Sequence, residues 1–111
     1  MDKYTELSDF EINKKVANLV LNGDYIASEG NQEIYLATMD GGDFLPIAYF
    51  DPCNNPTDAM PIIIENEISM IKSSGGWMCC HGSVGQVERE NLYRGAMEVF
   101  LMMKEAENEK V

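Results

Sequence analysis

The sequence is poor in several kinds of residue that mark particular classes of protein. It has one histidine and three cysteines among 111 residues, and Cys79 and Cys80 are neighbours in the chain. Neighbouring residues on a strand point to opposite faces, so this odd set predicts reduced, buried thiols rather than a disulfide framework. We therefore expect the chain in a reducing compartment.

Long apolar runs and a basic, apolar start are also missing from the sequence. No apolar stretch approaches the roughly 18 to 20 residues that a membrane span needs. The first residues, "MDKYTELSDF", have neither the basic start nor the apolar stretch of a signal peptide. The sequence therefore predicts a cytoplasmic protein with no membrane partner.

Basic residues are scarce. Eight Lys and Arg stand against 19 Asp and Glu, which gives a formal net charge of -11. Such a charge opposes binding to nucleic acid or anionic lipid, so we expect no nucleic-acid partner. Solubility is the simpler explanation of the excess acid. Mimicry of DNA is the alternative, because Glu98, Glu105 and Glu109 fall along one face of a predicted helix.

The length and the 45% hydrophobic content fit a single domain over residues 1–111. A helix is predicted over residues 9–22. Ser8 and Glu11 have the spacing of a capping box, and Gly23 supplies a left-handed stop. A second long helix is predicted over residues 90–108, in which Gly95 indicates close packing against a neighbour.

Short β-branched and aromatic runs between these helices predict strands. "DYIAS" and "EIYLAT" are separated by a four-residue turn, and "FLPIAYF" follows the turn "DGGD". Pro46 places this third strand at an edge or makes it a strand start. "EISMI" and "WMCCH" are further strands, and residues 82–89 are expected to form a loop. The fold class is α+β: an antiparallel sheet of about four or five strands packed by an N-terminal and a C-terminal helix.

The stretch "PCNNPTDAMPIIIEN" at residues 52–66 predicts a short buried helix in the middle of the chain. Asn55 before Pro56 resembles an N-cap followed by proline at the first helical position. Pro61 would interrupt this helix or restart it with Asp58 as a second cap. Capping does not require both Asn54 and Asn55, and polar groups at a helix N-terminus favour an anion.

Catalytic and metal sites are not expected. Cys79, Cys80 and His81 are consecutive, so they cannot converge on one metal ion or form a nucleophile pair from a single strand. No spacing of the carboxylates singles out an acid and base couple. "SSGGW" and "HGSVG" are rich in glycine but match no phosphate-binding loop. We predict that the chain is not an enzyme and uses no cofactor.

Three segments, "LSDFEINKKVA", "CNNPTDAMPIIIENEISM" and "AMEVFLMMKEAENE", closely resemble the NinX-type family of small tailed-phage proteins. Met60 and Gly95 stand where that family commonly has Trp and Ala. The resemblance implies an accessory, non-virion phage protein acting in the host cell. It implies no enzymatic activity.

Two functions from different classes follow. The first is a counter-defence protein that sequesters a small nucleotide-type signalling ligand. In this hypothesis Trp77 would stack on a base, Arg94 would bind phosphate, and the remaining ligand-binding residues would read polar groups: Asn54, Asn55 and Asp58. Each has a structural alternative, since Trp77 can be core and Arg94 can pair with Glu98 four residues on. The second function is an acidic protein that binds and blocks a host defence protein.

A homo-oligomer is also predicted. The last helix carries more apolar side chains than one inward stripe needs, and excess apolar surface on a small protein tends to mark an interface. The residues concerned are Met97, Leu101, Met102 and Met103.

Overall fold

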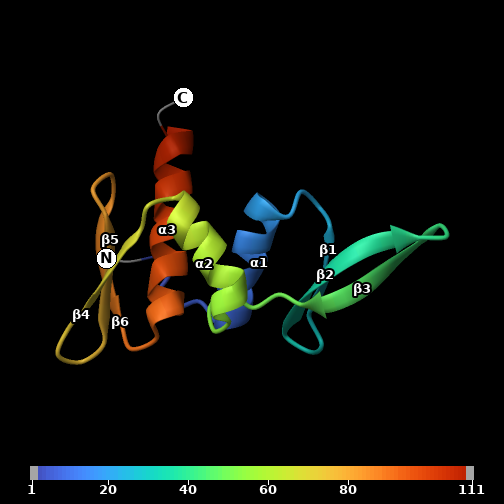
Figure 1. Ribbon diagram of the computed structural model, residues 1–111, viewed down its shortest axis with the longest axis horizontal. Helices are drawn as coiled ribbons and strands as arrows, with labels where there is room; N and C mark the ends of the chain where they lie inside the picture. Colours follow the sequence, from blue (N-terminus) through green and yellow to red (C-terminus); the bar gives the residue numbers. More distant parts are fainter. Residues whose placement is uncertain (1–2, 110–111) are drawn as a thin grey trace. The chain divides into compact units, whose positions relative to one another are not determined.

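The computed structural model describes residues 3–109 of the chain. They form two compact units, which divide between Asp51 and Pro52, and each is described by itself. The first unit holds α1 and strands β1 to β3, and the second holds α2, strands β4 to β6 and α3 (Figure 1).

Helix α1, Asp9–Val20, begins at the capping box that the sequence predicts. The amide of Glu11 donates to the Ser8 hydroxyl at 3.1 Å, and the Ser8 amide donates to Glu11 Oε1 at 3.0 Å. The helix ends two residues before the predicted boundary, because Asn22 already adopts a positive φ of 50°. Asn tolerates this conformation better than most residues.

The first sheet has the strand order β1-β2-β3, with all pairs antiparallel. The strands are β1, Tyr25–Ser28, β2, Glu33–Asp40, and β3, Asp43–Tyr49. The hairpin between β1 and β2 is confirmed, as is the turn at Gly41 and Gly42, where both residues have the positive φ that this kind of turn requires. Pro46 lies on an edge strand, as predicted.

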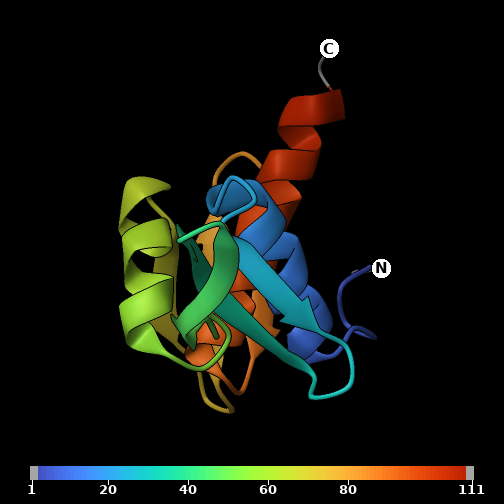
Figure 2. The ribbon, with the colours of Figure 1, turned by 90° about the vertical axis from the view of Figure 1, so that its right-hand side faces the viewer.

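Helix α1 packs against β2 and closes the core of the first unit. Figure 2 shows the sheet in front of this helix. The buried side chains of the helix follow a 3.6-residue period. The buried side chains of β2 lie three residues apart, on either side of the point where its pairing with β3 shifts register. They include Phe10, Ile12, Val16 and Ala17 from the helix and Ile34 and Ala37 from the strand.

Helix α2, Pro56–Glu65, is capped by Asn55, whose side chain accepts from the Thr57 amide at 3.0 Å. Pro61 neither interrupts nor restarts it, and the helix runs through that residue without a second cap. The prediction that α2 is buried on most sides is wrong. Ala59, Ile62 and Ile63 are buried, but Ile64 is 68% exposed.

The second sheet has the strand order β4-β5-β6. Its strands are β4, Ser69–Lys72, β5, Trp77–His81, and β6, Gly85–Arg89. The expectation of a loop over residues 82–89 is therefore wrong. A tight turn, in which the Val84 amide donates to His81 O at 3.1 Å, returns the chain to pair with β5. Val87 is the single buried residue of β6, so its apolar pattern is too weak to predict a strand.

The α+β class is confirmed, but the expected single sheet of four or five strands is wrong. The six strands described divide into two three-stranded sheets, each built from strands consecutive in sequence. Each sheet is formed by pairing of strands that are neighbours in the sequence. Helix α2 lies between the two groups of strands along the chain. The two long helices accordingly pack on different sheets, α1 on the first and α3 on the second.

Helix α3, Leu92–Glu109, packs on β5 and β6 and against α2 (Figure 1). Gly95 explains how closely it approaches the sheet, since a Cβ atom there would lie 2.9 Å from Cys79 Sγ. The argument for an oligomer through this helix is wrong, because Met97, Leu101 and Met103 are already buried within the chain. A homo-oligomer itself stays a prediction.

Candidate functional site

The five residues predicted to bind a ligand all lie in the second unit. Asn54 and Asn55 immediately precede α2. Asn54 Oδ1 accepts from Asn91 Nδ2 at 2.7 Å, and Asn91 Oδ1 in turn accepts from the amides of Tyr93 and Arg94 at 2.9 and 3.2 Å. The capping residue of α3 is thus bonded to the residue before the cap of α2. The structure brings these two helix N-termini together.

Arg94 begins α3, but its side chain is directed to a protein carboxylate. Its Nε donates to Glu98 Oε2 at 2.7 Å, and the Arg94 side chain is only 12% exposed. The alternative reading of Arg94, pairing with Glu98 four residues on, is therefore confirmed. Asp58, in the first turn of α2, is half-buried.

Glu98 is a fully buried carboxylate shared by two arginines. Arg89 on β6 donates to it through Nε at 2.9 Å and through Nη2 at 2.8 Å, in addition to the bond from Arg94. The burial of Glu98 removes it from the acidic helix face that suggested a DNA mimic. Its role is to join β6 to α3, because a buried charge requires paired partners.

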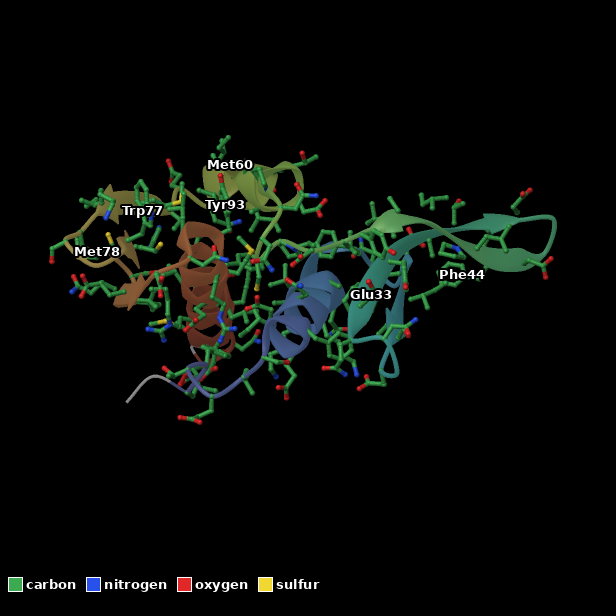
Figure 3. All side chains as sticks on the ribbon, turned by 90° about the horizontal axis from the view of Figure 1, so that it is seen from below. Glu33, Phe44, Met60, Trp77, Met78 and Tyr93 are labelled. Carbon is green, nitrogen blue, oxygen red and sulfur yellow. The ribbon has the colours of Figure 1, made fainter. Side chains whose placement is uncertain are left out.

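Trp77 is half-buried at the start of β5, beside Lys72 of β4 and Arg89 of β6 in the strand register. The Lys72 ammonium lies 5.8 Å from the centre of the indole ring. The same ammonium donates to Ser73 O and Gly76 O at 2.6 and 3.1 Å, which holds the turn before β5. Trp77, labelled in Figure 3, belongs to β5, whereas Asn54 and Asn55 precede α2. Its stacking partner in the structure is a protein cation.

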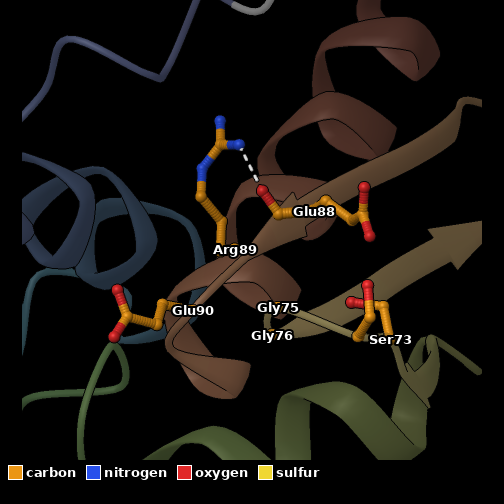
Figure 4. Close-up of a pocket in the computed structure, with 7 residues that line it drawn as sticks. Ser73, Gly75, Gly76, Glu88, Arg89 and Glu90 are labelled. Atoms are coloured by element: carbon orange, nitrogen blue, oxygen red, sulfur yellow. Dashed lines mark hydrogen bonds between the residues drawn. The ribbon is translucent and has the colours of Figure 1, made fainter.

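A hollow of about 340 Å³ lies beside the turn that precedes Trp77 (Figure 4). Glu88 and Glu90 line it with Arg89, whose Nη1 donates to Glu88 O at 2.6 Å while the rest of the guanidinium serves Glu98. Ser73 Oγ is buried there without a hydrogen-bond partner. Two carboxylates make this hollow unfavourable for phosphate.

A second hollow, of about 420 Å³, lies in the first unit between α1 and β1. Lys14, Lys15, Phe10 and Tyr25 line it together with two glutamates. Lys14 Nζ is paired with Glu29 at 2.6 Å. The lysines of this hollow are therefore balanced by glutamates that line it as well.

Cys79 and Cys80 point to opposite faces of β5, as predicted. Cys79 is fully buried and its Sγ donates to Leu92 O at 3.4 Å. Cys80 is half-exposed, so the prediction of buried thiols is wrong for this residue. Burial raises the pKa of the Cys79 thiol to about 11, with smaller contributions from Cys80 and Glu98. A thiol of this kind is a poor nucleophile at neutral pH. Within residues 3–109 no three His, Cys, Asp or Glu side chains are grouped to hold a metal ion.

Most of the exposed large apolar side chains among the described residues lie elsewhere, on the hairpin of β2 and β3. Strand β1 pairs with Glu33 to Leu36 of β2. Past this point β2 and β3 continue as a two-stranded ribbon to the turn at Gly41 and Gly42 (Figure 1). We call the segment from Ala37 to Tyr49 the β2–β3 ribbon.

Both faces of the β2–β3 ribbon carry apolar side chains. Met39 lies opposite Phe44, and Leu45 opposite Thr38, on the other face. Every residue of β3 is exposed. The large apolar side chains of the β2–β3 ribbon have exposed fractions far above those of core residues: Met39 63%, Phe44 38%, Leu45 42%, Ile47 64% and Tyr49 62%.

The sequence carried a signal for this surface that our interpretation did not use. "FLPIAYF" is apolar at every position, which is the pattern of a strand covered on both faces. Pro46 places the same strand at an edge, where one face is ordinarily solvated. These two indications conflict unless the strand is covered by something outside its own sheet.

Comparison with known proteins supplies the family. The family model described as Bacteriophage P22, NinX matches residues 3–104, nearly the whole chain. The chain belongs to this family. The resemblance seen in the sequence is thus confirmed, and membership of the NinX family makes the chain a phage accessory protein. Neither curated proteins nor solved structures give a match. None of the helices within residues 3–109 combines the length and the apolar character that crossing a membrane would take.

Proposed function

We propose that this NinX-family chain acts in the host cytoplasm as a non-enzymatic counter-defence protein that binds and blocks a host protein. The observation that carries the proposal is the apolar surface of the β2–β3 ribbon. Small soluble proteins rarely leave large apolar patches uncovered, and such patches mark interaction sites. Met39, Ile47 and Tyr49 are each more than 60% exposed, which a purely structural hairpin does not need.

The arginines of the chain are engaged in ion pairs within it, and this supports a protein partner over a phosphorylated ligand. Arg89 and Arg94 are both bonded to Glu98. Lys72 is held over Trp77. The net charge of -11 instead favours a partner with a basic surface, because complementary charge speeds association.

The test is capture of a partner from host cells by two matched variants. Ile47→Lys places a charge on the β2–β3 ribbon, and Ile64→Lys places the same charge on α2 at a side chain that is exposed to a similar extent. Neither side chain is buried, so both variants should fold. We expect one host protein to be retained in stoichiometric amount by the wild type and by Ile64→Lys, and to be lost by Ile47→Lys. Equal retention by all three would refute the proposal.

Sequestration of a nucleotide-type ligand is the second candidate, favoured by the bond between Asn54 and Asn91. That bond brings the N-termini of α2 and α3 together, and helix N-termini attract anions. In this candidate Asn54, Asn55 and Asp58 form the site. Trp77 and Arg94 contribute less than the sequence suggested, since each has a partner within the chain.

The second candidate is tested by a melting screen of cyclic dinucleotides and cyclic ADP-ribose isomers. A ligand at a hundred times its dissociation constant adds about 2.7 kcal/mol to the unfolding free energy. For a chain of this length, that is a rise of roughly 10 °C in melting temperature. Asp58→Asn keeps the size of the side chain and removes its charge, so it should change the rise caused by the ligand. If no ligand shifts the wild type, the residues at 54–58 serve only as a helix start.

A further inference from the structure

We infer that the β2–β3 ribbon inserts into an apolar cleft of its partner and that Lys and Arg line the rim of this cleft. The inference rests on the proposed function and adds to it the mode of binding and the chemistry of the partner's site. Three features of the ribbon carry it: apolar side chains on both faces, a blocked outer edge, and acids without bases.

The first feature is the distribution of apolar side chains over two faces. Met39 and Phe44 lie opposite each other on one face, and Leu45 lies on the other. Contact with a flat surface would cover one face and leave the other in water. A cleft covers both, and the burial of each such side chain favours binding. The ribbon is two strands wide, about 5 Å between strand axes, which suits insertion.

The second feature is the outer edge of β3, which is built against addition of another strand. Ala37 donates its N–H to Asp24 O at 3.1 Å, on the side away from β3. In an antiparallel pair the N–H and C=O of one residue point to the same side, so its partner Pro46 turns its backbone away from β2. Proline has no N–H, and the outer edge therefore lacks a donor at this position.

A register shift at Leu36 and Ala37 adds to this effect. It leaves an extra residue on β3, and bulges of this kind bend a strand and disrupt its pairing. Proline and bulges are the devices by which edge strands avoid pairing with other strands. The ribbon is therefore exposed for contact through its side chains rather than through its backbone.

The third feature is charge. From Glu33 through Asp51, both included, the chain has four acids and no Lys, Arg or His. Asp40 and Asp43 are paired at the tip of the ribbon, on either side of the turn. A second copy of the chain, with its own charge of -11, would repel this tip. A basic rim would attract it, and like charges would exclude wrong partners.

The experiment places a photo-reactive benzoylphenylalanine at one position at a time in the full chain, expressed in host cells. Position 44 probes one face of the β2–β3 ribbon, position 45 probes the other, and position 64 on α2 is the control. We expect positions 44 and 45 to cross-link to the same host protein, at peptides on opposite walls of one cleft. Position 64 should give no such product.

The charge of the rim is tested by neutralising the tip. In Asp40→Asn with Asp43→Asn, we expect the captured partner to bind about tenfold more weakly at low salt, and the difference from wild type to shrink as salt rises. Glu107→Gln with Glu109→Gln makes the same change in net charge at the end of α3, and it should alter binding less than twofold.

The outcomes separate this inference from the proposed function. Absence of any host protein cross-linked or captured by the wild type would overturn both. Capture with cross-links from a single face, or with no effect of the tip variant, would overturn the inserted mode and leave the proposed function standing. Cross-linking of position 44 or 45 to a second copy of the chain would overturn the inference in favour of self-association.

Discussion

Arg94 Nε lies 2.7 Å from Glu98 Oε2, one turn further along α3, and the Glu98 carboxylate has no exposed surface. Arg89 reaches the same carboxylate from β6 with two further bonds. This relationship decides how two residues singled out in the sequence are used. Arg94 joins the first turns of α3 through Glu98, and Glu98 is not part of an acidic surface.

Replacing Glu98 should destabilise the protein strongly. Glu98→Gln removes the charge and leaves two largely buried guanidinium groups without their carboxylate. Breaking a buried ion pair in this way costs about 3–5 kcal/mol. Glu107→Gln is the matched control, because Glu107 pairs with Lys104 on the exposed side of the same helix. That change should cost less than about 0.5 kcal/mol. Urea unfolding of both variants measures the difference, and equal midpoints would contradict the role of Glu98.

Gly95→Ala should lower the free energy of unfolding only while Cys79 is present. The new Cβ would lie 2.9 Å from Cys79 Sγ, and overpacking of this kind costs about 1–3 kcal/mol. The higher helix propensity of Ala relative to Gly stabilises the protein by about 1 kcal/mol. We expect a net loss of about 1 kcal/mol in the wild type and a gain of similar size in a Cys79→Ala background. A double-mutant cycle by denaturant unfolding tests this, and the same sign in both backgrounds would show that the contact does not limit packing.

Ser8→Ala should lower the unfolding free energy by about 0.5–2 kcal/mol, the usual cost of losing an N-cap. Bonds from the backbone and side chain of Ser8 lower the pKa of Glu11 below its ordinary 4.5. A folded-state pKa below the unfolded value gives stability that is present above the unfolded pKa and is lost as pH falls through the folded pKa. Ser8→Ala keeps the backbone N–H that bonds Glu11, so the pH dependence belongs to the Glu11 carboxylate, and the difference between wild type and Glu11→Gln should be largest near neutral pH and shrink below about pH 4.5. Melting curves at pH 7 and at pH 3 check this, and a difference that does not vary with pH would count against the capping box.

Alkylation should distinguish the two neighbouring cysteines. Burial raises the pKa of Cys79 from 9.0 to about 11, which lowers its thiolate fraction at pH 8 roughly a hundredfold. Cys80 is half-exposed on the opposite face of β5. Iodoacetamide at pH 8 should therefore modify Cys80 first, and Cys79 only after unfolding in urea. Peptide mass spectrometry at timed intervals reads the order. Modification of Cys79 at the rate of Cys80 would mean that β5 is not held against α3 as described.

Local features of the fold were predictable because each depends on residues close together in the chain. The Ser8 and Glu11 cap, the turn at Gly41 and Gly42, and the start of α2 at Asn55 and Pro56 all arise from steric and hydrogen-bond preferences over a few residues. Even the close packing at Gly95 was indicated, because glycine is unfavourable in a helix unless space demands it.

Tertiary structure decided the features that depend on residues far apart. Periodicity predicts a strand but not its partners, so the division into two sheets and the pairing of β6 followed only from the assembled structure. The sequence did not indicate a role for Arg89 or Asn91, because the fold alone brings them to Glu98 and Asn54. The sequence by itself determined the elements, the caps and the acidity of the chain. Which charges are buried and which apolar side chains stay exposed was decided by packing, because burial is a property of all the neighbours that the folded chain places around a residue.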